Sequence, residues 1–292
     1  MTSREPSRCG RFARPCTLAL MMLVPLSGLS AAPDAQGMPG EGVVSVDETL
    51  CREMKVHHVL APESPVGCER LKLLRFGYID FAGQLRDDGQ IVVLDAVANH
   101  VLNIFRTLRR MQFPIAKAKL MNDYEGNDDR SMADNNTSAF NVRKIVGENA
   151  ISLHSYGLAI DVNPVQNPYA KPTGDTLQFS PPAGIEFANR LDDRPGVSPR
   201  PGMAELIVDA FANDGFLIWG GYWTDPIDYQ HFQVTHTLAE RLVHLAPEQA
   251  TAQFESYVQS YRNCVHSADA PAPAHRVRCI EDVDKGDRPS ND

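Results

Sequence analysis

Residues 157–162 carry the local pattern that most restricts the fold, because small and large side chains alternate along them. On a β-strand, alternate side chains point to the same face. One face would hold Leu158, Ile160 and Val162, and the other would hold Gly157, Ala159 and Asp161. The large side chains can fill a core, whereas the small ones leave open space beside Asp161, which His154 reaches from the preceding turn. The pattern predicts a buried strand that presents a carboxylate and an imidazole to one cavity, and such ligands suit zinc.

A second cluster, residues 228–232, places an acid three residues before a histidine. The spacing suggests a division of labour, in which His231 completes a three-ligand site and Asp228 handles the proton of the metal-bound water. The fourth metal position would stay open, as in a catalytic rather than a structural zinc site. Either cluster alone is a weak signal, because a single Asp or His in a strand more often makes a structural hydrogen bond. The nearby Trp223 belongs either to the core or to a wall of the substrate site.

Taken together, these residues resemble the zinc peptidases of bacterial cell walls. That family includes VanY-like D-alanyl-D-alanine carboxypeptidases and phage L-alanyl-D-glutamate endopeptidases. Its signature is Ser-x-His-x-x-Gly-x-Ala-x-Asp followed by acid-x-x-His. The matching positions are Ser152, His154, Gly157, Ala159, Asp161, Asp228 and His231. The resemblance covers about residues 90–235.

The resemblance implies a role for each site residue. One Zn²⁺ per chain would be bound by His154, Asp161 and His231, with Asp228 as the general base. The transition-state arginine would be Arg143, which would stabilise the oxyanion and hold a substrate carbonyl or carboxylate. Arg130, in an Arg-Ser pair, is the alternative for that role. The residues expected to contact the substrate are Arg130, Ser152 and Trp223.

The implied fold is α+β, a single domain of the hedgehog/DD-peptidase type with a small antiparallel sheet that carries the zinc site and is flanked by helices. The implied function is hydrolysis of peptide bonds in peptidoglycan stem peptides. Asp228 and Phe232 resemble the endopeptidase branch, because the carboxypeptidase branch usually has Glu and Trp there. A D-alanyl-D-alanine carboxypeptidase remains the alternative, and a non-catalytic zinc-containing cell-wall binding protein is the alternative of another class.

The N-terminus reads as an export signal. Four arginines precede the apolar run Leu18–Leu29, and small residues follow at 30–32. This order is typical of a secretory signal peptide. The apolar run is shorter than the ~20 residues that span a bilayer. We therefore expect cleavage after residue 32, a periplasmic or secreted product, and no integral membrane span after processing.

Four cysteines, at positions 51, 68, 264 and 279, would remain after cleavage. An even number in an exported chain fits two disulfides. Three connectivities are possible, and the two local pairs, Cys51 with Cys68 and Cys264 with Cys279, are favoured because each closes a short loop. Removal of four arginines and one glutamate leaves 36 acidic and 24 basic residues, a formal charge of -12. Nucleic acid is therefore an improbable partner.

The rest of the chain divides into a flexible leader at 33–48, a peptidase domain at 49–265 and a disordered tail at 266–292. Within the domain we expect a hairpin in 71–94, a helix over 97–111 capped by Asp95, loops at 123–136 and 164–201, and helices over 204–213 and 238–263, the last broken at Pro247. The remaining histidines lack partners at ligand spacing and are expected on the surface or in local hydrogen bonds: His57, His58, His100, His236, His244, His266 and His275.

Overall fold

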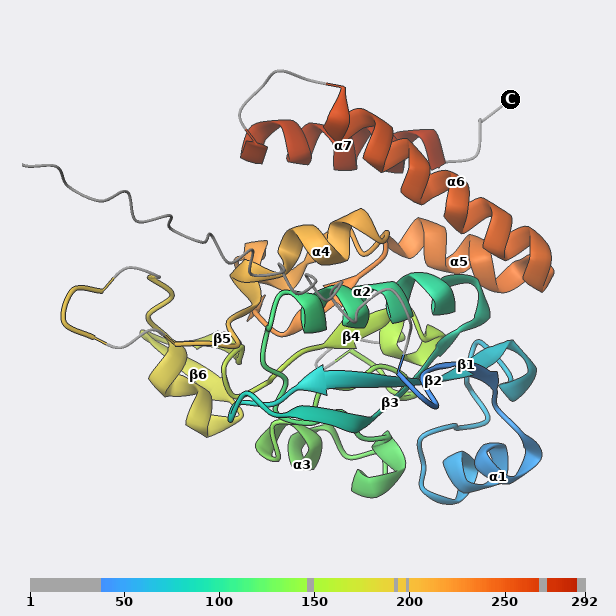
Figure 1. The fold of residues 1–292 in the computed structure, drawn as a ribbon, viewed down its shortest axis with the longest axis horizontal. Coiled ribbons are helices and arrows are strands. Elements are labelled where there is room, and N and C mark those ends of the chain that lie inside the picture. The colour runs from blue at the N-terminus through green and yellow to red at the C-terminus, as the bar shows by residue number, and fades with distance from the viewer. Residues whose placement is uncertain (1–37, 146–149, 192–193, 198–199, 268–271, 288–292) are drawn as a thin grey trace, which may run out of the picture. The chain divides into compact units, whose positions relative to one another are not determined.

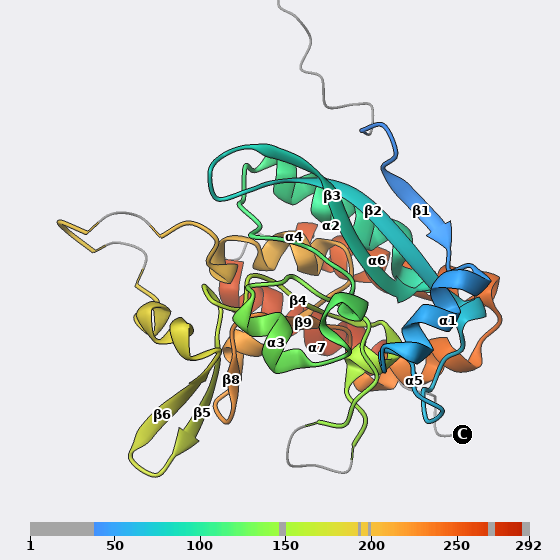
Figure 2. The ribbon, with the colours of Figure 1, turned by 90° about the horizontal axis from the view of Figure 1, so that it is seen from below.

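The computed structural model describes residues 38–145, 150–191, 194–197, 200–267 and 272–287. The expected signal peptide lies outside these residues. The described part is a mixed α/β domain with three small antiparallel sheets and helices around them (Figures 1 and 2). No helix among the described residues is long and apolar enough to cross a membrane.

The first sheet contains the predicted hairpin. Strands β2 (Leu71–Ile79) and β3 (Leu85–Leu94) pair antiparallel, and β1 (Gly42–Ser45) adds to the other edge of β2. The Asp80 carboxylate accepts hydrogen bonds of 2.9 Å from the backbone N–H groups of Ala82 and Gln84, which fixes the turn. The hairpin is confirmed. The expected flexible leader is wrong over β1, because that strand is paired.

Helix α2 (Ala98–Arg110) packs against β2 and confirms the predicted helix. Its apolar face is fully buried, which agrees with the helical spacing of its large side chains. The expected capping by Asp95 is wrong. The Asp95 carboxylate instead accepts hydrogen bonds of 2.7 and 3.0 Å from the Arg70 guanidinium, and residues 95–97 form a 3-10 turn before the helix.

The second sheet contains the motif strands. Its order is β4 (Ala159–Asp161), β9 (His231–Gln233) and β7 (Ile218–Trp219), with Asp161 directly opposite His231. The sheet is joined to β3 by a hydrogen bond of 3.1 Å from the Leu94 N–H to the Gly157 carbonyl. The prediction of a small antiparallel sheet is confirmed, and two of the three candidate ligands, Asp161 and His231, lie on it.

The third sheet corrects the long loop expected at 164–201. Strands β5 (Tyr169–Thr173) and β6 (Thr176–Ser180) form a protruding hairpin, and β5 also pairs with β8 (Ile227–Asp228) (Figure 2). A 3-10 helix follows at Pro182–Phe187. Strand β8 pairs with only two residues of β5, Tyr169 and Ala170, so Pro172 can occupy β5 without removing a hydrogen bond to β8.

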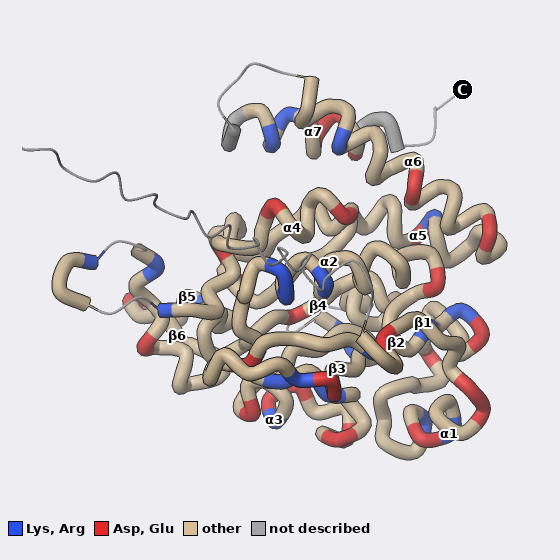
Figure 3. The backbone as a smooth tube through the Cα atoms, viewed as in Figure 1, with Lys and Arg blue, Asp and Glu red and all other residues tan. Residues whose placement is uncertain are grey.

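Short and C-terminal helices complete the domain: α1 (Glu48–Val56), α3 (Asp128–Ala133), α4 (Val208–Asn213), α5 (His236–His244), α6 (Pro247–His266) and α7 (Ala272–Asp287). The predicted break at Pro247 is confirmed. The loop expected at 123–136 is wrong in part, because the Asn127 side chain caps α3 by accepting a hydrogen bond of 2.9 Å from the Arg130 N–H. Acidic and basic residues are interspersed over these elements (Figure 3).

Both predicted disulfides are confirmed, Cys51–Cys68 and Cys264–Cys279. The second disulfide joins α6 to α7, and the buried side chains of Cys279 and Val283 pack into the core. The disordered tail expected at 266–292 is therefore wrong over α7. The Arg276–Asp209 ion pair and the partly buried side chain of Ile280 add to the contacts of this helix with the domain.

Candidate metal centre and active site

The site begins at a tight 3-10 turn, Leu153–Tyr156, that positions His154. The Ser152 hydroxyl caps the turn by accepting a hydrogen bond of 3.3 Å from the His154 N–H. Gly157 ends the turn with φ +69°, and a Cβ there would lie 2.6 Å from the Leu94 nitrogen. Only glycine satisfies both the left-handed backbone and the close approach to β3. The turn thus brings His154 next to β4.

Three side chains from this turn and from two paired strands converge. The Nε2 atom of His154 lies 3.2 Å from Asp161 Oδ2, and the Nδ1 atom of His231 lies 2.9 Å from Asp161 Oδ1. The two imidazole nitrogens are 3.2 Å apart. All three side chains are buried, and their ligand atoms lie within 4.8 Å of one another. The structure therefore brings together the three residues that the sequence singles out as metal ligands.

Each imidazole is held from its far side by an acceptor. The Nδ1 atom of His154 lies 2.5 Å from the backbone carbonyl of Ala139, and the Nε2 atom of His231 lies 2.7 Å from Gln233 Oε1. Sequence reasoning missed both acceptors. Gln233 has a readable signal, because it lies two residues after His231 and so faces the same side of the strand. The Ala139 carbonyl has none, because its position depends on the fold.

The two histidines keep the buried Asp161 carboxylate ionised. Burial raises the pKa of Asp161, but the charges and hydrogen bonds of His154 and His231 outweigh burial and hold the pKa well below its usual value. Burial lowers the pKa of His231, but Asp161 and Asp228 outweigh that effect and raise it. A buried carboxylate that needs two imidazoles to stabilise its charge is a suitable place for a cation.

Asp228 lies beside the cluster, at the end of β8. Its Oδ1 atom is buried and has no hydrogen-bond partner among the described residues. Burial raises the pKa of Asp228, and the negative charge of Asp161 adds to the effect, so that the pKa lies at about 7. Asp228 therefore differs from Asp161, which is held ionised.

The two candidate arginines have different surroundings. The Arg143 side chain pairs with Asp128, and its charge lowers the pKa of Asp228. The backbone N–H of Arg143 donates a hydrogen bond of 2.9 Å to the Ser155 hydroxyl. Arg130 is exposed on α3, and no contact with the cluster is found for it among the described residues. Of the two, Arg143 is the one whose charge reaches the site.

The other two residues expected to contact the substrate, Trp223 and Ser152, have different surroundings. The Trp223 ring is half-buried and its centroid is 5.5 Å from that of His231. Ser152 is buried, and its hydroxyl is engaged in capping the turn that carries His154. Trp223 thus lies beside His231, whereas Ser152 fixes the turn that carries His154.

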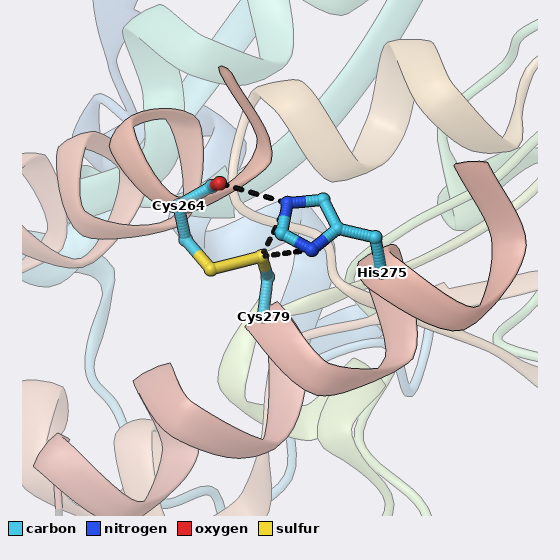
Figure 4. A group of neighbouring side chains, drawn as sticks. All are labelled: Cys264, His275 and Cys279. Carbon is cyan, nitrogen blue, oxygen red and sulfur yellow. Dashed lines mark hydrogen bonds between the residues drawn. A yellow bond between two sulfur atoms is a disulfide. The ribbon is translucent and has the colours of Figure 1, made fainter. Parts of the chain in front are cut away.

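A second group of metal-ligating types lies at the C-terminal disulfide. His275 lies beside the disulfide, with Nε2 2.9 Å from the Cys264 carbonyl and 3.5 Å from the Cys279 sulfur (Figure 4). Cysteine binds metals as a free thiolate, and here both sulfurs are consumed by the disulfide. His275 thus has the local hydrogen bond that the sequence predicts for it.

Part of the chain is similar to a known peptidase family. A family model described as D-alanyl-D-alanine carboxypeptidase matches residues 146–234, a segment that includes His154, Asp161, Asp228 and His231. The match confirms the resemblance to the VanY-like family over this segment. No curated protein and no solved structure matches the chain.

Proposed function

We propose that the protein is an exported zinc metallopeptidase that hydrolyses peptide bonds in the stem peptides of peptidoglycan. The observation that carries the proposal is the convergence of His154, Asp161 and His231 beside a buried carboxylate, Asp228. The family match supports the substrate class. The N-terminal sequence supports export, and the two disulfides are compatible with an oxidising compartment.

The residues of the cluster fit zinc. Two imidazole nitrogens and one carboxylate oxygen form a common donor set for catalytic zinc, and each imidazole has the outer hydrogen bond that usually accompanies ligation. Zinc at such a site supplies Lewis acidity and activates water. His154, Asp161 and His231 would hold the ion.

Asp228 would act as the general base. Its buried, unpartnered Oδ1 atom is free to accept a proton and to return it to the leaving amine. None of the three ligand residues is free for this role, because their nitrogen and oxygen atoms face one another. The assignment separates proton transfer from metal binding.

Arg143 and Trp223 would position the substrate. Peptidoglycan stems are rich in carboxylates and the mature chain is acidic, so the substrate needs a local cation. Arg143 is the candidate whose charge reaches Asp228, and it would stabilise the oxyanion or hold a substrate carboxylate. Trp223 would pack against the peptide beside His231.

The bond that is cleaved has two candidates. The family match favours removal of the terminal D-alanine by a carboxypeptidase. The aspartate at position 228 and the charge of -12 favour the endopeptidase reaction that the sequence predicts. Phe232, the other endopeptidase-like residue, is buried and stacks on Phe211 with ring centroids 3.9 Å apart, so it cannot select a substrate by direct contact.

One experiment tests the function and separates these reactions. The zinc-loaded mature protein is incubated with a pentapeptide stem that ends in D-Ala-D-Ala and with the same stem amidated at its C-terminus, and the products are identified by mass spectrometry. A carboxypeptidase releases D-alanine from the free stem only, whereas an endopeptidase cleaves both stems at an internal bond. Binding of the stems without cleavage would instead indicate the non-catalytic alternative. If the stems are neither bound nor cleaved, the proposal is overturned.

A further inference from the structure

We propose that Gln233 is a positioning residue for the metal centre, because its side-chain oxygen fixes the proton of His231 on Nε2 and so directs Nδ1 toward Asp161 and His154. The inference rests on the proposed function in one respect, namely that the cluster holds a metal. It adds a residue that the resemblance does not include.

The contact is short and buried. The Oε1 atom of Gln233 lies 2.7 Å from Nε2 of His231, and both side chains are 7% exposed. The two residues lie on the same face of β9, two positions apart. Strand β9 is central in its sheet, and Gln233 is paired with Ala159 on one side and with Ile218 on the other. Because β9 is hydrogen-bonded to a strand on each side, the backbone of Gln233 is fixed, and this restricts the position of its side-chain amide.

The chemistry of the pair determines which nitrogen is available. An amide oxygen only accepts a hydrogen bond, so the facing Nε2 must carry the proton. The Nδ1 atom, 2.9 Å from Asp161, is then the one nitrogen of His231 that can offer a lone pair to a metal. Without an acceptor at position 233, the proton could move between the two nitrogens and part of the population would present the wrong tautomer.

His154 also has an acceptor behind its ring, but there the acceptor faces Nδ1 and not Nε2. Its Nδ1 atom faces the carbonyl of Ala139, which also only accepts, so the proton stays on Nδ1 and Nε2 faces the cluster. The two ligands thus use different nitrogens, and each has a fixed acceptor behind it. The acceptor of His154 is a backbone group, whereas the acceptor of His231 is a side chain that can be replaced.

The test measures zinc affinity and the tautomer of His231 in the full mature protein. Gln233→Met keeps the length of the side chain but removes the acceptor, Gln233→Glu keeps an acceptor, and Gln178→Met on the exposed strand β6 is the matched control. Zinc dissociation constants come from competition with a chromogenic chelator. We expect about 10–100-fold weaker binding in Gln233→Met, little change in Gln233→Glu and none in Gln178→Met.

The outcomes separate a positioning role from a structural one. Equal zinc affinity of the folded Gln233→Met variant and the wild type would overturn the inference. The ¹⁵N resonances of the His231 ring in the wild type, recorded at an alkaline pH at which the ring is neutral, give a second readout, which needs neither variant nor metal. An Nε2–H protected from exchange supports the inference, and its absence overturns it. Failure of the wild type to bind zinc would instead count against the proposed function.

Discussion

Asp228 differs from the neighbouring Asp161 in its surroundings, and this difference leads to a prediction at the level of a single residue. Asp161 faces two imidazoles, whereas Asp228 Oδ1 has no hydrogen-bond partner among the described residues. Asp228→Ala should therefore leave zinc bound but lower kcat/KM about 100-fold or more, the usual loss on removal of a general base. Kinetic assays and metal analysis of the same preparation check this. Loss of metal together with activity would make Asp228 a ligand instead.

The arginine assignment can be tested with a matched pair. Under the proposed function, Arg143→Ala should lower kcat about 100- to 1000-fold, because it would remove the cation that stabilises the oxyanion. Arg130→Ala should have little effect, because Arg130 is exposed on α3. Steady-state kinetics of both variants, with thermal unfolding as a control for the lost Arg143–Asp128 pair, give the comparison. A large loss in Arg130→Ala alone would reverse the assignment.

The sequence predicts those parts of the candidate site that depend on the spacing of residues along the chain. Ala159 and Asp161 are on one face because strand periodicity requires it, and His154 is close because the turn is short. Gly157, which the sequence places on the same strand face, instead ends the turn before the strand. The Ala139 carbonyl behind His154 and the close approach of Leu94 to Gly157 are tertiary contacts, so no local pattern announces them.

At the scale of elements, Asp214 joins α2 to α6 at the end of α4. It accepts hydrogen bonds of 2.9 Å from Asn103 and 3.0 Å from Arg262, and lies 2.9 Å from Nδ1 of His100. Glu255 lies 3.0 Å from the other nitrogen of His100. Burial lowers the pKa of His100, but Asp214 and Glu255 outweigh burial and raise it.

This helix junction should make stability depend on pH. Because the pKa of His100 is raised on folding, its stabilising charge is fully present below the unfolded pKa of about 6.5 and is lost as pH rises through the folded value. The free energy of unfolding of the wild type should therefore exceed that of His100→Gln by about 1.5–3 kcal/mol at a pH below the unfolded pKa. The difference should be smaller at a pH above the folded pKa. Denaturant unfolding across this pH range checks the sign. A difference that grows with pH would contradict it.

The elements that the sequence misses are those stabilised by their neighbours. The β2–β3 hairpin and α2 have strong periodicity and are predicted, since their own apolar faces determine them. The β5–β6 hairpin is short and interrupted by Pro172, and it depends on pairing with β8. Helix α7 has weak amphipathicity and depends on Cys279.

At the scale of the whole molecule, the C-terminal disulfide should stabilise the domain without serving the site. The Cys264→Ser/Cys279→Ser double variant removes a cross-link between residues 15 positions apart, which corresponds to about 3 kcal/mol in the chain-entropy description. We expect a lower free energy of unfolding, faster hydrogen exchange in α7 and unchanged zinc content. If α7 keeps its protection in the variant, packing rather than the disulfide holds it.

The central claim is that His154, Asp161 and His231 form one zinc site in the folded chain, and metal analysis of the purified mature protein tests it most directly. The account predicts one zinc per chain, removed by a strong chelator with a fall in the unfolding temperature, and absent from His154→Ala. No stoichiometric transition metal in any preparation, together with an unfolding temperature that chelation leaves unchanged, would contradict the account.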